Sequence, residues 1–173
     1  MTVATESETR IYVACLAAYN NGKLHGAWID AAQDADDIET EVKAMLKASP
    51  EPGAEEWAIH DYEGFHGLKI DESKPFDVVA ELAAILEEHG EAYALYAGNV
   101  GLESASPEDF EEAYQGEWDS EENFTENSFR DCQNIPGHLD MYIDWASMAR
   151  DWFCGDYYSL QDGNGQLHVF QNI

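Results

Sequence analysis

The stretch DFEEAYQGEWDSEENF, Asp109 to Phe124, decides what kind of fold this chain can have. It holds seven carboxylates and no Lys or Arg, yet its four aromatic residues are of the kind that build a core. Disordered acidic segments contain few aromatic residues. The stretch therefore predicts folded elements that turn their rings inward and their carboxylates outward.

The same combination extends over the whole chain. Its 36 Asp and Glu residues stand against 8 Lys and Arg, a formal net charge of −28, while 45% of its 173 residues are hydrophobic. Such a chain can form one ordinary domain or two to three small ones. Self-repulsion of this size destabilises a compact state, so we expect something outside the fold to use the charge. Solubility and adaptation to high salt are the simpler alternatives.

Cysteine usage and the N-terminus indicate the compartment. Cys15, Cys132 and Cys154 are odd in number and form no CxxC pair, so neither a disulfide framework nor a zinc site is expected. The segment Met1–Arg10 is polar, and no apolar run reaches membrane-spanning length. We expect a soluble, cytoplasmic protein whose charge excludes direct binding to nucleic acid or to an anionic membrane.

Residues 1–65 predict a small sheet with one helix. The runs Arg10–Asn20 and Lys23–Asp30 flank the turn signal Asn20-Asn21-Gly22, which is typical of a β-hairpin. The segment EEWAIHDYEG at 55–64 favours a third strand. Strict alternation would place Trp57, Ile59 and Asp61 on one side of that strand.

The helix of this region is expected to begin at Asp34 and to stop before the PEPG break at 50–53. Its acidic first turn and the lysines near its end suit the helix dipole. Apolar residues fall on one helical face and carboxylates on another. The inward residues are Ile38, Val42, Met45 and Leu46, and the outward carboxylates are Asp34, Asp37 and Glu41.

Residues 66–105 predict a helical middle domain. Pro75 suits the first turn of a helix that runs to a stop at Gly90, and a second short helix is expected over residues 91–99. The apolar residues that recur at helical spacing are Phe76, Val79, Ala83 and Leu86.

Residues 106–173 predict a C-terminal α+β domain. Ser106 and Ser120 each precede an acidic first turn, and we expect them to cap helices that end at Gly116 and run through Arg130, respectively. On the first helix, Phe110 and Tyr114 would share the inward face. The carboxylates of Glu108, Glu111 and Glu112 would then point to solvent.

The remainder of this domain is expected to be one longer amphipathic helical stretch after Pro136, followed by a hairpin that turns at Asp162–Gly165. The apolar positions of the stretch are Leu139, Tyr142, Ile143, Ala146 and Met148.

Motifs for catalysis are missing from the sequence. DGNGQL at 162–167 resembles part of a calcium loop, but its first and last ligand positions would be Leu160 and Gln171, where carboxylates are needed. The six histidines lack metal-site spacing, and there is no nucleophile elbow or phosphate-binding loop. We therefore expect no enzyme, no metal site and no cofactor.

The distribution of charge is more informative. Acidic residues outnumber basic ones in 1–65, in 66–105 and in 106–173, so the charge decorates folded elements rather than a tail. Duplex DNA carries one phosphate charge per ~1.7 Å of axis, so a charge of −28 matches roughly 14 base pairs, or ~48 Å. A chain of three small domains could reach such a length.

Four stretches of the chain resemble the ArdA antirestriction family. They are IYVACLAAYNNGKLHGAWID (11–30), DFEEAYQGEWDSEENF (109–124), IPGHLDMYIDWASMARDW (135–152) and HVF (168–170). The resemblance implies an elongated α+β protein of three small domains in a line (1–65, 66–105 and 106–173) that dimerises through the last. It also implies an acidic DNA mimic that occupies the DNA-binding groove of type I restriction–modification enzymes and protects incoming mobile DNA.

The residues expected to meet this partner are exposed carboxylates of the predicted helices and turns. A rival hypothesis is an acidic binding module for another basic DNA-binding protein, and a further one is an enzyme with an acidic surface. The candidate carboxylates are Asp34, Asp37, Glu41, Glu108, Glu111, Glu112, Glu117, Asp119, Glu121 and Glu122.

Overall fold

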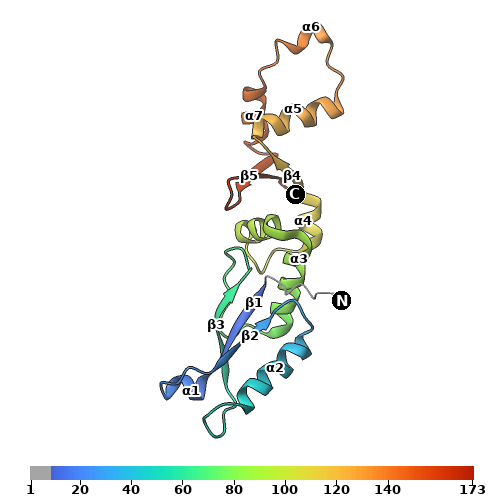
Figure 1. Ribbon diagram of the computed structural model, residues 1–173. Helices are drawn as coiled ribbons and strands as arrows, with labels where there is room; N and C mark the ends of the chain where they lie inside the picture. The colour runs from blue at the N-terminus through green and yellow to red at the C-terminus, as the bar shows by residue number, and fades with distance from the viewer. Residues whose placement is uncertain (1–8) are drawn as a thin grey trace, which may run out of the picture. The chain divides into compact units, whose positions relative to one another are not determined.

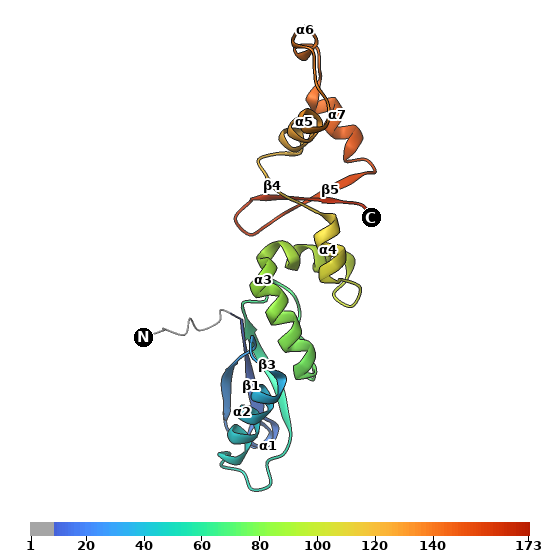
Figure 2. The same ribbon diagram turned by 90° about the vertical axis from the view of Figure 1, so that its right-hand side faces the viewer.

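The computed structural model describes residues 9–173 (Figures 1 and 2). The chain divides into two compact units, one up to Ala94 and the other from Leu95 to Ile173. Each unit contains helices and one three-stranded antiparallel sheet. The α+β fold class is thereby confirmed, and the division into three domains in a line stays a prediction.

The sheet of the first unit has the strand order β2-β1-β3. The predicted hairpin is confirmed: β1 (Arg10–Cys15) pairs with β2 (Gly26–Asp30). A short helix that the sequence did not predict, α1 (Leu16–Asn20), lies in the connection. At the end of this helix, the N–H groups of Asn21 and Gly22 donate hydrogen bonds to carbonyl groups of its last turn.

The third strand, β3 (Trp57–Glu63), also lies where it was predicted. The prediction that its side chains alternate strictly between the two faces was wrong. Ala58 and Ile59 are both buried, whereas Asp61 is exposed. The pairing with β1 passes from Tyr12–Asp61 to Val13–Ile59 and skips His60. This irregularity inserts one extra residue into β3, and an inserted residue reverses the sides on which the following side chains point.

Helix α2 (Ala35–Lys47) lies along one face of this sheet (Figures 1 and 2) and confirms the predicted helix. Asp34 is its N-cap residue, and Lys47 lies in its last turn. Ile38, Val42 and Met45 are buried, and together with Ile29 and Val13 they form the core of the first unit.

Helix α3 (Phe76–Val100) contains the two predicted helices of the middle region, which meet at Gly90. The backbone there is not helical, with φ 63° and ψ −152°. Only glycine adopts this region without strain, because any Cβ collides with the backbone. Gly90 therefore changes the direction of the chain within α3.

We expect Gly90→Ala to lower the free energy of unfolding by about 1–3 kcal/mol, because alanine would be held in a conformation that favours glycine. No atom outside the nearby backbone of α3 and the chain neighbours lies within 4 Å of the added Cβ, so the cost arises from the backbone conformation rather than from a clash with packed side chains. Urea unfolding followed by circular dichroism measures the change. Gly155→Ala, at another open site without positive φ, is the control and should be close to neutral. Equal stability of parent and Gly90→Ala would contradict this account.

The second unit contains a sheet of order β4-β6-β5, and its first strand was missed by the sequence analysis. Helix α4 (Pro107–Ala113) ends before Tyr114, and β4 (Tyr114–Trp118) follows at once. Gly116 therefore does not end a helix: it lies within β4 with φ 95°, between the pairings of Tyr114 and Glu117 with β6. Tyr114 nevertheless stacks on Phe110, with 5.0 Å between ring centroids, so the predicted inward pair is confirmed.

The next helix and the closing hairpin agree with the predictions. Helix α5 (Glu121–Cys132) begins after Ser120, whose side chain accepts a hydrogen bond from the N–H of Asn123. Strands β5 (Tyr157–Gln161) and β6 (Leu167–Gln171) pair antiparallel around the predicted turn.

The prediction of one longer helical stretch after Pro136 was wrong. The chain instead forms one helical turn, α6 (Gly137–Asp140), and then a separate helix, α7 (Trp145–Trp152). Asp144 precedes α7 as its N-cap residue, and its carboxylate accepts a hydrogen bond from the N–H of Ser147, which starts the new helix. Figure 1 shows α6 at the far end of the loop that joins α5 to α7. Three of the predicted apolar positions are exposed rather than packed, namely Leu139, Tyr142 and Ala146.

Two clusters of aromatic rings hold the second unit together. Phe170 of β6 is fully buried and contacts Phe110, Tyr114 and Tyr158, with centroid distances of 5.2–6.3 Å. Phe124 of α5 is surrounded by four further rings, those of Trp118, Trp152, Phe153 and Tyr157. The stretch from Asp109 to Phe124 thus contributes two rings to each cluster.

Candidate functional site

The three candidate carboxylates of the first unit lie at the start of α2. Asp34, Asp37 and Glu41 are all exposed. Glu41 accepts a hydrogen bond of 2.7 Å from the side-chain amide of Gln33, which fixes its position on the helix surface. With ~1.5 Å of rise per residue, these three side chains place a negative charge roughly every 5 Å along the helix.

The other seven candidates lie in the second unit, on α4, on β4, at Asp119 between β4 and α5, and at the start of α5. Ser106 and Ser120 cap the two helices, so their acidic first turns face solvent at the positive end of each helix dipole. Six of the seven are exposed. Glu121 is the exception, because it is half-buried and accepts a 2.7 Å hydrogen bond from the hydroxyl of Ser159.

The structure brings further carboxylates to the group on α2. A surface hollow of the first unit is lined by Asp34 and Asp37 and also by Asp77 and Glu81 of α3. The sequence analysis did not propose Asp77 and Glu81 as site residues. Their spacing of four residues on a predicted helix was the available signal, because it places both on one face.

A hollow in the second unit adds Asp109 to the group on α4. It is lined by Asp109 and Glu112 together with Tyr96 and Tyr158. Burial, and then the negative charge of Asp109, raise the pKa of Tyr96 above its ordinary value. Burial, and then the charge of Glu117, do the same for Tyr114. Both phenols are therefore neutral at physiological pH, and the negative charge of the hollow comes from the carboxylates of Asp109 and Glu112.

Four of the cations pair with carboxylates outside the ten candidates. Arg10 pairs with Glu63 at 2.6 Å, and Lys43 with Glu39 at 3.1 Å. Lys23 pairs with Glu51, and Arg130 with both Glu126 and Asp140. The ion pairs of these four cations therefore involve none of the ten candidate carboxylates.

The strand that carries Glu117 is fixed by a buried polar chain. The hydroxyl of Tyr114 and Nδ1 of His168 share a 3.0 Å hydrogen bond, and Nε2 of His168 lies 3.5 Å from Asp162. Desolvation works to raise the pKa of Asp162, but hydrogen bonds from the N–H groups of Gln166 and Asn164 outweigh it and hold the pKa below its ordinary value. This chain ties β4 to the β5–β6 turn.

We expect Asp162→Asn to lower the free energy of unfolding at neutral pH, by an amount that vanishes as the pH falls. Because the folded-state pKa is depressed, the carboxylate's contribution is present above the unfolded pKa and is lost as pH falls through the folded pKa. Urea unfolding of parent and variant over a pH series measures the difference. The exposed Asp151→Asn is the control. A difference for Asp162→Asn that does not depend on pH would contradict the assignment.

Between residues 9 and 173, no three His, Cys, Asp or Glu side chains gather in a way that could hold a metal ion. Across the same residues, no helix has both the length and the apolar character that crossing a membrane requires.

Comparison with models of protein families identifies a family that the chain matches. The model of a family described as antirestriction protein (ArdA) matches residues 11–165, which is most of the chain. A search of curated proteins found none that matches.

Proposed function

The chain belongs to the ArdA family of antirestriction proteins, and from that premise we propose that it acts as an acidic mimic of DNA. Antirestriction proteins are inhibitors rather than enzymes. In our proposal, the partner is a type I restriction–modification enzyme, and the inhibitor occupies the DNA-binding groove of its methyltransferase core. Incoming mobile DNA would be protected because the groove is no longer free to bind it.

The observation that carries the proposal is a dense set of exposed carboxylates on folded elements. A DNA-binding groove favours DNA because its Lys and Arg residues replace the cations condensed on the phosphates. Carboxylates fixed on α2 in the first unit, and on α4 and α5 in the second, can bind such Lys and Arg residues at several positions at once, and within each unit their spacing is already set by the fold. No chemical step is needed for inhibition.

Such a mimic should compete with DNA of any sequence. Phosphate contacts position a protein on DNA, whereas contacts to base edges read the sequence. The helices of this protein offer charge but no base edges, so inhibition should not depend on the recognition sequence of the target enzyme.

We expect one charge to matter little and many together to matter strongly. Glu112→Ala should change the affinity by less than about fivefold, because exposed ion pairs are individually weak. A variant with nine amides should bind at least roughly a hundredfold more weakly. Its changes are Asp34→Asn, Asp37→Asn, Glu41→Gln, Glu111→Gln, Glu112→Gln, Glu117→Gln, Asp119→Asn, Glu121→Gln and Glu122→Gln. The measurement is displacement of fluorescent duplex DNA from a purified type I methyltransferase core.

Two controls separate a shaped surface from simple acidity. Polyglutamate of equal charge should displace DNA far less well than the protein. A second variant replaces nine exposed carboxylates outside the candidate set with amides, and it should lose less affinity. These residues are Asp61, Asp71, Glu72, Glu87, Glu88, Glu103, Asp131, Asp151 and Asp156. The proposal would be contradicted if the protein displaced DNA no better than polyglutamate of equal charge. It would also be contradicted if the variant with nine amides in the candidate set inhibited as well as the parent protein. Binding only to other basic proteins would favour the rival acidic module.

We further propose that the protein is a homodimer joined through its second unit. The loop between α5 and α7 exposes three neighbouring apolar side chains, with exposed fractions of 47% for Leu139, 79% for Met141 and 78% for Tyr142. Apolar side chains gathered on a soluble protein are typical of an interaction surface. A dimer would also double the charge presented to the partner.

We expect the double change Met141→Glu and Tyr142→Glu to weaken dimerisation at least roughly a hundredfold, because it places charge where apolar side chains would meet. Sedimentation equilibrium measures the dimer constant. Leu24→Glu is the matched control: this residue is 91% exposed but lies in the first unit, so its change should leave the dimer intact. A monomeric parent, or an unchanged dimer in the double variant, would contradict this interface.

A further inference from the structure

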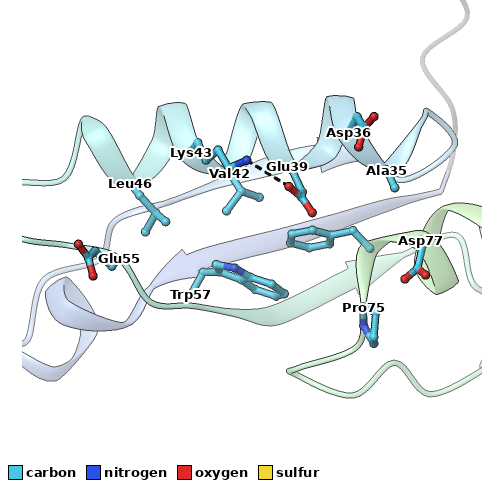
Figure 3. Close-up of a pocket in the computed structure, with 11 residues that line it drawn as sticks. Ala35, Asp36, Glu39, Val42, Lys43, Leu46, Glu55, Trp57, Pro75 and Asp77 are labelled. Carbon is cyan, nitrogen blue, oxygen red and sulfur yellow. Dashed lines mark hydrogen bonds and ion pairs between the residues drawn. The ribbon is translucent and has the colours of Figure 1, made fainter.

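The first unit contains a groove between α2, the start of β3 and the start of α3 (Figure 3). Its volume is about 610 Å³. Val42 and Leu46 contribute from α2, Trp57 from β3, and Pro75 and Phe76 from the entry to α3. The groove is therefore assembled from three segments of the chain that lie far apart in sequence.

The floor of the groove is aromatic. The rings of Trp57 and Phe76 stack with 4.2 Å between centroids and 22° between planes. Phe76 is buried, whereas Trp57 is only half-buried and remains accessible. Figure 3 shows the indole below the side chains of Val42 and Leu46. Packing on Phe76 holds the indole in one orientation before any partner binds.

The rim of the groove is negative. Asp36 and Glu39 lie on α2, Glu55 lies before β3, and Asp77 lies in the first turn of α3. Among residues 9–173, Lys43 is the one Lys or Arg that lines the groove, and it is 74% exposed and paired with Glu39 at 3.1 Å. Three carboxylates from three different segments, those of Asp36, Glu55 and Asp77, thus line the same groove as the aromatic rings, and Lys43, the lining cation of the described residues, pairs with Glu39 instead of with them.

We propose that this groove receives an arginine side chain from the DNA-binding surface of the inhibited enzyme. A guanidinium stacks on an aromatic face and can bind carboxylates at the same time through its planar set of N–H groups. The groove offers both features within one space. This inference rests on the proposed function for the identity of the partner. It adds one specific side-chain contact of defined geometry to the many exposed carboxylates of the proposed binding surface.

Other occupants fit less well. An anionic or nucleotide ligand would meet the negative rim, and a neutral apolar ligand would leave the carboxylates unused. Lysine carries its charge as a compact, strongly hydrated ammonium and stacks less well on an indole than arginine does. The groove should therefore prefer arginine to lysine at equal charge.

Peptide binding to the full-length protein tests the groove without any restriction enzyme. The five tryptophans are replaced by 5-fluorotryptophan, and the Trp57 resonance is assigned with Trp57→Phe. Acetylated triarginine should shift this resonance saturably, with a dissociation constant at least about threefold lower than that of trilysine. Triglutamate should not bind. A Trp57 resonance that moves no more than those of the other tryptophans would overturn the proposal.

A pair of charge-matched variants tests the groove in inhibition. The groove variant carries Asp36→Asn, Glu39→Gln, Glu55→Gln and Asp77→Asn. The control carries Asp71→Asn, Glu72→Gln, Glu87→Gln and Glu88→Gln, four exposed sites of the same unit outside the groove. Circular dichroism checks that both variants are folded.

The groove variant should lose triarginine binding and displace DNA roughly tenfold less well than the control variant. Equal inhibition by the two variants would overturn the groove while the proposed function stands. Failure of the parent protein to displace DNA would instead overturn the proposed function, and the peptide measurement would still decide whether the groove binds arginine.

Discussion

Burial of aromatic rings is the interaction on which the rest of the second unit depends, because it must outweigh the repulsion among carboxylates attached to the same elements. Phe124 is buried among four rings, and Phe170 packs against Phe110 of α4 and Tyr158 of β5. Aromatic side chains bury a large area each and gain further from edge and stacked contacts. The same backbone that carries these rings inward carries the carboxylates outward, so each helix is stabilised on one face and charged on the other.

The helix ends decide where the charge lies. Serine caps start α4 and α5, and aspartate precedes α2, so acidic residues occupy first turns in which the helix dipole is favourable to them. This local compensation lowers the cost of holding the charge. Salt screens the remaining repulsion and weakens attraction to a basic partner as well. The fold and its proposed binding therefore respond to ionic strength in opposite directions.

Spread charge and a shaped groove have different consequences for binding. Exposed carboxylates attract a basic surface over a distance and tolerate the loss of any one member. An aromatic groove with a negative rim selects one kind of side chain and acts only on contact. The two together would give a mimic that approaches its partner by charge and is then fixed in register by a single anchor. Trp57 is central to this second role because Phe76 holds its ring in place.

Local sequence determined the helix starts at Ser106 and Ser120 and the hairpin turn after Gln161. It also determined that Phe110 pairs with Tyr114 on the inward side and that the carboxylates point to solvent. These features depend on residues that are close neighbours in the sequence. Tertiary structure alone decided that β4 is a strand, since its partner β6 lies some fifty residues further along the chain. It also decided the irregularity at His60 and the groove at Trp57. Each of these arises from contacts between distant segments, which no local pattern of residue types records.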